Sequence, residues 1–328
     1  MNRLRGLSAA VVVLLLVGCT AATTPAPTDR PTAVLTVAPD ALGWASRAAA
    51  PFSLTEVAGA AFEGELWVAG GLDLARAGSD LVGVYDPRTD RWRTGPRLPN
   101  GVHHASLVGT PDGLFLLGGY VAAPDEQPSD GVWRLAPGAA EWVAAAALPE
   151  PRGAGAAAWD GERIVYGGGV GPAGVSDTVW ALEEGQWSVV GRLSRAREHL
   201  AATSGGDGRS WFLGGRTGGL ETNLGTVDVV EGAAARFVGE VPTTRGGVAA
   251  FWWPAGGACL VGGESPGGTN TEVECIDADG GVTDLPRLQV ARHGLTAAVI
   301  DDVALVGLGG PQPGLFVSDV LEALPLGR

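Results

Sequence analysis

Short apolar stretches recur along most of the chain, and each ends at a pair of glycines that precedes a loop. Examples are Leu66 to Gly71 and Leu114 to Gly119. Alternating apolar and polar residues follow, as in Asp80 to Asp86. Stretches this short, rich in branched and aromatic residues and bounded by glycine turns, are typical of β-strands rather than helices. The pattern therefore predicts an all-β protein.

The glycine pairs recur at a nearly constant spacing. We assign six copies, with first glycines at Gly70, Gly118, Gly167, Gly214, Gly262 and Gly309, so that successive copies are 48, 49, 47, 48 and 47 residues apart. A fourth strand carries an aromatic residue in most copies, at Trp92, Trp142, Trp187 and Phe237, with Val282 in the fifth copy. Four strands form a sheet that cannot bury both faces alone, so we expect the copies to pack around an axis.

The two ends of the repeated region complete one copy. After Gly310 only 18 residues remain, which suffices for a third strand at Phe316 to Leu321 but not for a fourth. Trp44 precedes Trp92 by 48 residues, one repeat. We therefore expect the strand at Trp44 to complete the sixth sheet. The alternative is an additional strand outside the ring.

These residues resemble the kelch repeat, which combines a Gly-Gly doublet, a strand with Tyr or Trp, and a Trp on the outer strand. The resemblance extends from residue 42 to residue 328 and implies a six-bladed β-propeller with four-stranded blades. A repeat of this kind indicates a fold more strongly than an activity.

An export signal precedes the repeats. Arg3 and Arg5 are followed by an apolar run, and Leu16 to Cys19 resembles the lipobox of bacterial lipoproteins. The resemblance implies a signal peptide at 1–18, lipidation of Cys19, and an exported protein that contacts the membrane through its lipid anchor alone. An ordinary signal peptide or an N-terminal membrane anchor is the alternative. The Thr, Ala and Pro residues up to 41 predict a flexible linker, so the propeller comprises 42–328.

The composition limits the classes of molecule that the chain is expected to bind. The formal net charge is −14 and no lysine is present, which argues against binding to nucleic acid. If Cys19 is lipidated, Cys259 and Cys275 remain, spaced about equally from a hairpin centre near residue 267. We expect them to lie opposite each other and to form a disulfide in an oxidising compartment, two separate thiols being the alternative. We expect a monomer.

Candidate binding residues occur at the starts of the innermost strands and in the loops after the glycine pairs. Because successive strands are antiparallel, these segments lie on one face of the ring. The candidates are Arg152, Arg197, Arg245, Arg292, Arg216, His103, His199, His293, Tyr120, Glu56, Glu198 and Glu264. The first four occupy equivalent positions in consecutive blades, which predicts a positive face suited to a carboxylate or another anion. The alternative is that these arginines pair with carboxylates or carbonyls inside the fold.

We favour a binding module that recognises an acidic peptide or an anionic sugar. The kelch resemblance supports this, because kelch domains that bind acidic peptides use arginines at this place. The alternative is an extracytoplasmic enzyme, since the layout is similar to that of six-bladed kelch sialic acid mutarotases. Glu56, Glu198 or Glu264 would then supply the acid, and no residue is assigned a catalytic role.

Metal chemistry is not expected from the sequence. Galactose oxidase-like copper sites need two tyrosines, two histidines and a cysteine crosslinked to a tyrosine, and Tyr85, Tyr120 and Tyr166 show no matching arrangement. His103 and His104 are adjacent, and neighbours on a strand point to opposite faces, so they are poor joint ligands. We therefore predict no metal and no other cofactor.

Overall fold

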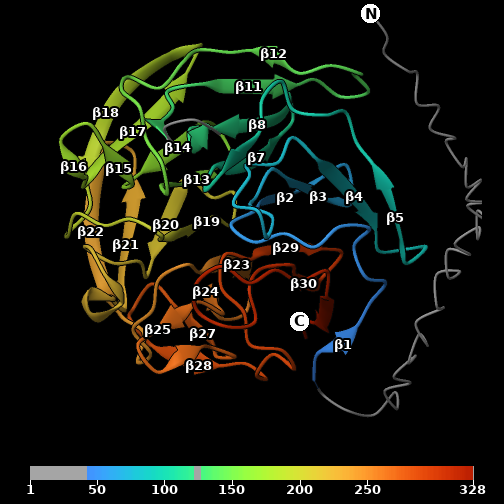
Figure 1. Ribbon diagram of the computed structural model, residues 1–328. Helices are drawn as coiled ribbons and strands as arrows, with labels where there is room; N and C mark the ends of the chain where they lie inside the picture. The colour runs from blue at the N-terminus through green and yellow to red at the C-terminus, as the bar shows by residue number, and fades with distance from the viewer. Residues whose placement is uncertain (1–42, 122–126, 328) are drawn as a thin grey trace, which may run out of the picture. The chain divides into compact units, whose positions relative to one another are not determined.

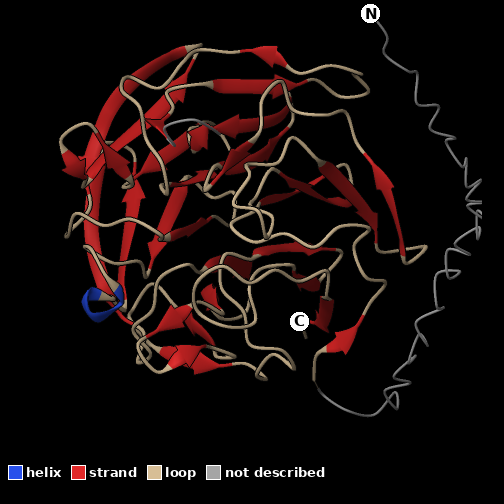
Figure 2. Ribbon diagram, in the orientation of Figure 1, coloured by secondary structure: helices blue, strands red, loops and turns tan. Residues whose placement is uncertain are grey.

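The computed structural model describes residues 43–121 and 127–327, all within the compact unit Val37–Arg328. The predicted signal peptide, Cys19 and the linker up to residue 41 lie outside the described residues. The described part contains six four-stranded antiparallel sheets (Figure 1). Strands predominate, and the 3-10 turn η1 (Leu220–Thr222) is the one helical element drawn among these residues (Figure 2). None of the described segments is a helix long and apolar enough to cross a membrane.

Each sheet is one blade. The first strands of the six blades line a central channel, and the fourth strand of each blade is outermost. The first has β2 (Ala58–Phe62), β3 (Glu65–Ala69), β4 (Val82–Asp86) and β5 (Arg91–Thr94). The second has β7 (Ser106–Thr110), β8 (Gly113–Leu117), β11 (Val132–Leu135) and β12 (Val143–Ala144). The third has β13 (Ala156–Trp159), β14 (Ile164–Gly167), β17 (Thr178–Glu183) and β18 (Gln186–Arg192).

The remaining blades repeat this order. The fourth has β19 (Ala201–Thr203), β20 (Arg209–Leu213), β21 (Thr226–Glu231) and β22 (Ala234–Glu240). The fifth has β23 (Ala249–Trp253), β24 (Gly257–Val261), β27 (Val273–Ile276) and β28 (Val282–Asp284). The sixth has β29 (Thr296–Ile300), β30 (Val303–Gly307), β31 (Leu321–Pro325) and β1 (Ala45–Ser46). Short loop strands are β6 (Val102–His103), β9 (Tyr120–Val121), β10 (Gln127–Pro128), β15 (Val170–Gly171), β16 (Gly174–Val175), β25 (Glu264–Ser265) and β26 (Gly268–Thr269).

The N-terminal strand closes the sixth blade, as predicted. In the pairing of β1 with β31, Ala45 lies opposite Ala323 and Ser46 opposite Glu322. The third strand of this blade is β31, which begins at Leu321, so the predicted strand at Phe316 to Leu321 was placed too early. The ring is thus closed by backbone hydrogen bonds between the two ends of the described chain.

Tryptophans in the outer strands, or immediately before them, form hydrogen bonds to neighbouring blades. The indole Nε1 of Trp44 donates to the Pro286 carbonyl of the fifth blade at 2.6 Å. Trp92, Trp142 and Trp187 donate in the same way to carbonyls of the preceding blade at 2.8, 3.0 and 2.9 Å. Phe237 and Val282 have no donor at this position and are exposed. The aromatic pattern of the repeat therefore reflects contact between blades as well as burial.

The glycine doublets bring each blade close to the next one. Gly118 and Gly119 have φ values of 61° and 87°, which side chains adopt only with strain. A Cβ on Gly118 would lie 2.5 Å from the carbonyl oxygen of Arg152, at the start of the following blade. The equivalent residues are Gly168–Gly169 in the third blade and Leu308–Gly309 in the sixth, because Gly168 and Leu308 make the same backbone bond as Gly118 to the third strand. The predicted doublet was thus one residue early at Gly167 and one residue late at Gly309.

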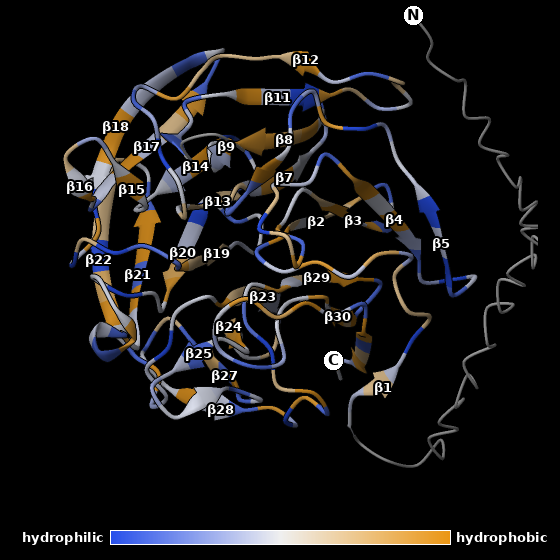
Figure 3. Ribbon diagram, in the orientation of Figure 1, coloured by the Kyte–Doolittle hydropathy of each residue, from blue (hydrophilic) through white to orange (hydrophobic). Residues whose placement is uncertain are grey.

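The core lies between blades rather than in one central cluster. In Figure 3, β8 and β21 are largely apolar, while many loops between strands are polar.

Within the fifth blade, Cys259 of β24 lies opposite Cys275 of β27, and the two form a disulfide. The predicted pairing is confirmed, and it joins the second and third strands of one blade.

Candidate functional site

A ring of backbone hydrogen bonds surrounds one mouth of the channel. One residue just before each innermost strand contributes to it: Glu56, His104, Ala154, His199, Gly247 and Gly294. Five bonds run from the N–H of one such residue to the carbonyl of the residue before it in the ring, at 2.8–3.1 Å, and Val57 N–H closes the circle on Gly294 at 3.2 Å. These six residues line a small, partly open cavity together with the residue that follows each of them. The ring therefore holds six side-chain positions around one opening.

All six ring residues have positive φ values, between 51° and 64°. Glycine adopts this conformation freely, and two blades have glycine there. Glu56, His104 and His199 carry side chains in the same conformation, which costs of the order of 1–3 kcal/mol each when not compensated. Ala154 has the same conformation, so the fold imposes it in every blade, and in three blades it places a polar side chain at the pocket.

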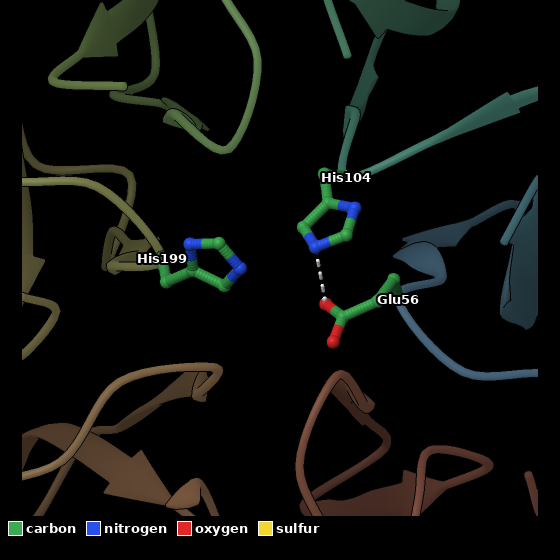
Figure 4. A group of neighbouring side chains, drawn as sticks. All are labelled: Glu56, His104 and His199. Carbon is green, nitrogen blue, oxygen red and sulfur yellow. Dashed lines mark ion pairs between the residues drawn. The ribbon is translucent and has the colours of Figure 1, made fainter. Parts of the chain in front are cut away.

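The carboxylate of Glu56 lies between two histidines. Its Oε2 is 3.2 Å from Nε2 of His104 (Figure 4), and its Oε1 is 3.6 Å from Nε2 of His293. The Nδ1 atom of His104 lies 2.6 Å from Nδ1 of His103, so one of these two nitrogens carries the proton between them. Glu56 and the three histidines thus form one connected polar group.

A second set of charges surrounds Arg216, in the loop after β20. Its Nε donates to Oε1 of Glu198 and its Nη1 to Oε1 of Glu264, both at 2.9 Å. Glu198 also contacts Nδ1 of His199 through its other oxygen. Glu264 approaches Nε2 of His293 at 3.9 Å. Arg216 is therefore committed to two carboxylates, which connect it to the ring residues.

The pKa shifts follow from burial and from these contacts. Burial lowers the pKa of His104 well below its ordinary value of 6.5, and the neighbouring His199 and His103 lower it further. His104 is therefore neutral near pH 7. Burial alone would raise the pKa of Glu198, but hydrogen bonds and charge from His199 and Arg216 outweigh it, so that pKa is lowered. Burial opposes the charge on Arg216, yet its bonds to Glu264 and Glu198 raise its pKa.

His103 and His104 do not point to opposite faces, contrary to the sequence-based expectation. The φ of 51° at His104 interrupts the strand alternation and turns its ring toward His103. His103 is buried and stacks on Tyr120, with ring centroids 5.4 Å apart. Tyr120 also contacts His104 edge-on at 5.7 Å. His104, which sequence reasoning left out of the candidate residues, is thus a central residue of the mouth.

The four arginines at equivalent positions do not form a binding face. Arg152, Arg197, Arg245 and Arg292 are at most 3% exposed. Nη1 of Arg197 lies 2.8 Å from Oδ2 of Asp228, and Nη2 of Arg292 donates to Glu322 at 2.6 Å. The guanidinium groups turn into their own blades, because buried carboxylates on β21 and β31 pair with them. The predicted arginine face is therefore wrong, and the internal pairing that was its alternative is what the structure shows.

The other two arginines, Arg245 and Arg152, also interact with groups of the protein itself. Arg245 pairs with Glu274 of β27. Arg152 instead lies over the ring of Trp180, 4.8 Å from its centroid, and pairs with Glu150. The sequence contains a pattern from which the pairing of these arginines with internal carboxylates could have been predicted. The partners Asp228, Glu274 and Glu322 recur at steps of 46 and 48 residues, close to the repeat length.

The remaining candidates come together at the mouth. Glu56, Glu198, Glu264, Arg216, His103, His199, His293 and Tyr120 all belong to the connected group described above, together with His104. All four histidines of the chain are in this group. Of the twelve predicted binding residues, only the four buried arginines lie apart from it.

The repeated blades and glycine doublets define a kelch-type β-propeller. Over 126 residues, 38% of this chain, the sequence is 28% identical to Kelch-like protein 35 of Mus musculus, and the match spans 21% of that protein. A solved structure of YjhT covers 84% of this chain and 96% of its own, with a TM-score of 0.69 and 14% sequence identity. At that identity the structural likeness shows the fold alone. No protein-family model matches the chain.

Proposed function

We propose that this chain is an extracytoplasmic binding protein that holds a sugar or short glycan at the channel mouth. The observation that carries the proposal is the gathering of titratable side chains at one end of the channel. Beyond the ring, small residues such as Ala58, Ala156, Ala201 and Ala249 line the wall, and no charged side chain of the described residues lines this part of it. Small-ligand sites use a few convergent polar groups to fix the orientation of the ligand.

The charges of the mouth favour a polyhydroxylated ligand over an acidic peptide. Three carboxylates face one guanidinium, and Arg216 already bridges two of the carboxylates. An acidic peptide would meet like charge there, which opposes binding. Sugar hydroxyls can donate to the carboxylates and accept from the imidazoles and Arg216. The carboxylate of an anionic sugar would meet the same like charge, so a neutral sugar should bind more tightly than an anionic one.

Calorimetric titration of the full chain tests this proposal. The ligands are a hexose, a hexuronate and N-acetylneuraminate, all with a metal chelator present. We expect at least one to bind, and Glu198→Gln to weaken it by about tenfold or more, since a hydrogen bond to a charged group contributes roughly 1.5–3 kcal/mol. The control is Asp207→Asn, an exposed acid that pairs with Arg209 outside the mouth. Failure of all three sugars, or equal effects of the two variants, would contradict the proposal.

A catalytic role is the second candidate, and the contact of Glu56 with His104 favours it. A neutral imidazole 3.2 Å from a carboxylate supplies a proton donor and a proton acceptor side by side. Opening a sugar ring at the anomeric centre requires one proton to leave the anomeric hydroxyl and one to reach the ring oxygen. Anomer exchange of N-acetylneuraminate, followed by NMR, would be accelerated by the chain and slowed about 100-fold or more by Glu56→Gln. If the chain does not accelerate exchange, the catalytic role is contradicted.

We also propose that the chain is exported and anchored by a lipid on Cys19, and that it is monomeric. The support for export and lipidation is the sequence from Arg3 to Cys19. The full chain should partition into the detergent phase, and Cys19→Ser should move it to the aqueous phase. Equal partitioning of both proteins would contradict lipidation, and size-exclusion with light scattering checks the oligomeric state.

A further inference from the structure

Three ring residues place potential metal ligands around one point. Glu56, His104 and His199 each offer a ligand atom, and these atoms all lie within 4.8 Å of one another. The three side chains come from three different blades and converge on the channel (Figure 4). We propose that they bind a divalent transition-metal ion such as Zn²⁺.

The donor set selects the class of ion. Two imidazole nitrogens and one carboxylate oxygen suit Zn²⁺, Fe²⁺, Co²⁺ or Ni²⁺, whereas Mg²⁺ and Ca²⁺ prefer oxygen ligands throughout. Three protein ligands are also the number found in zinc sites that keep a position for water or substrate. The ion belongs to the nitrogen-preferring group.

The spacing is close to what such an ion needs. Three atoms separated by at most 4.8 Å share a point that is about 2.8 Å or less from each of them. Zn–N and Zn–O bonds are about 2.0–2.2 Å long, so each ligand atom moves inward by less than about 1 Å. The hydrogen-bonded ring holds the three backbones, so rotation of the side chains supplies this movement.

Each of the three metal-binding side chains also contacts a second polar group through its other polar atom. Glu198 contacts Nδ1 of His199, and His103 contacts Nδ1 of His104 at 2.6 Å. These contacts leave Nε2 of both histidines for the metal. Glu56 uses Oε2 toward His104, while its Oε1 faces His293. Outer partners of this kind orient the ligands of metal sites and strengthen their binding.

The other three ring positions leave room for a further ligand. They are Ala154, between His104 and His199, and the neighbouring Gly247 and Gly294, none of which has a long side chain. A metal held by the three longer side chains would therefore keep coordination positions open toward the cavity. Its charge would also offset the excess of carboxylates at the mouth. This inference departs from the sequence-based expectation of no metal.

Cobalt titration of the chelator-stripped full chain tests the proposal without any sugar present. We expect one Co²⁺ per chain, visible absorption of a nitrogen-ligated site, and displacement by one Zn²⁺. Glu56→Gln, His104→Gln and His199→Gln should each weaken binding more than about 100-fold, because even outer partners contribute 10- to 100-fold. The matched control is Glu264→Gln, the same change in the same mouth at a residue outside the three ligands, which should weaken binding less than tenfold.

Two results would overturn the proposal. One is the absence of stoichiometric metal in the wild-type chain. The other is an equal loss in Glu264→Gln and Glu56→Gln, which would show general attraction to acidic groups. If a variant fails to fold, X-ray absorption of the zinc-loaded wild-type chain decides, since it must show two imidazoles and oxygen ligands. Sugar binding is measured with chelator, so the two proposals can fail separately.

Discussion

Replacement of a buried arginine tests whether these residues are structural. The side chain of Arg197 is fully buried, and its guanidinium lies 2.8 Å from Asp228 and donates to the Phe212 carbonyl at 3.0 Å. Arg197→Ala would leave the Asp228 carboxylate buried without its cation. Breaking a buried pair from one side costs about 3–5 kcal/mol. We expect a loss of this size in the free energy of unfolding.

Urea denaturation followed by tryptophan fluorescence measures this loss. The control is Arg192→Ala, which removes an ion pair with Asp177 that is similar in distance, 2.6 Å, but has an arginine side chain 68% exposed. An exposed pair contributes about 0–1 kcal/mol, so the control should remain close to the wild type.

The double variant Arg197→Ala/Arg245→Ala removes the arginines of two buried ion pairs. Its two losses fall in different blades, so together they amount to about 6–10 kcal/mol, comparable with the 5–15 kcal/mol that stabilises a typical protein. We expect it to be largely unfolded. The reasoning would be refuted if Arg197→Ala were as stable as Arg192→Ala and yet unable to bind a sugar.

Three further predictions concern the frame of the propeller. Trp44→Ala should lower the free energy of unfolding, measured by urea denaturation, by about 3–5 kcal/mol, because the side chain is buried and joins the closing strand to Pro286. A loss under 1 kcal/mol would contradict the closure. Cys259→Ala/Cys275→Ala should lower the free energy of unfolding by about 2–4 kcal/mol, and no change would mean that the bond is not formed. Burial raises the pKa of the Tyr166 phenol above its ordinary value of 10.0, so the unfolded chain loses this proton first and stability should fall as the pH rises above 10. Tyr166→Phe should reduce that fall, as measured by urea denaturation at a series of alkaline pH values, and an unchanged fall would assign it to other groups.

The fold was largely predictable because its determinants are local and repeated. The doublet at Gly118 reports a left-handed backbone, and Trp44 stands one repeat before Trp92. The closure and the Cys259–Cys275 pairing follow from counting residues along antiparallel strands. The predicted position of the doublet was wrong by one residue in the third and sixth blades. A third glycine next to Gly168, and a leucine at Leu308, make the doublet hard to locate in the sequence.

The site was predicted only in part, for two physical reasons. Position along a strand places Arg197 at the channel end of its blade, but the direction of its side chain depends on Asp228, which lies on another strand. His104 was set aside because regular alternation was assumed, and its positive φ breaks that alternation. Both errors concern directions of side chains, which the repeat spacing does not determine.

The most direct test of the central claim, that the ring at the channel mouth is the functional site, is an anomalous difference map. Crystals of the full chain are soaked in Zn²⁺, and data are collected at the zinc absorption edge. We expect one strong peak within bonding distance of Glu56, His104 and His199. A map with no peak at the mouth, or with its strong peaks only elsewhere on the propeller, would contradict the claim.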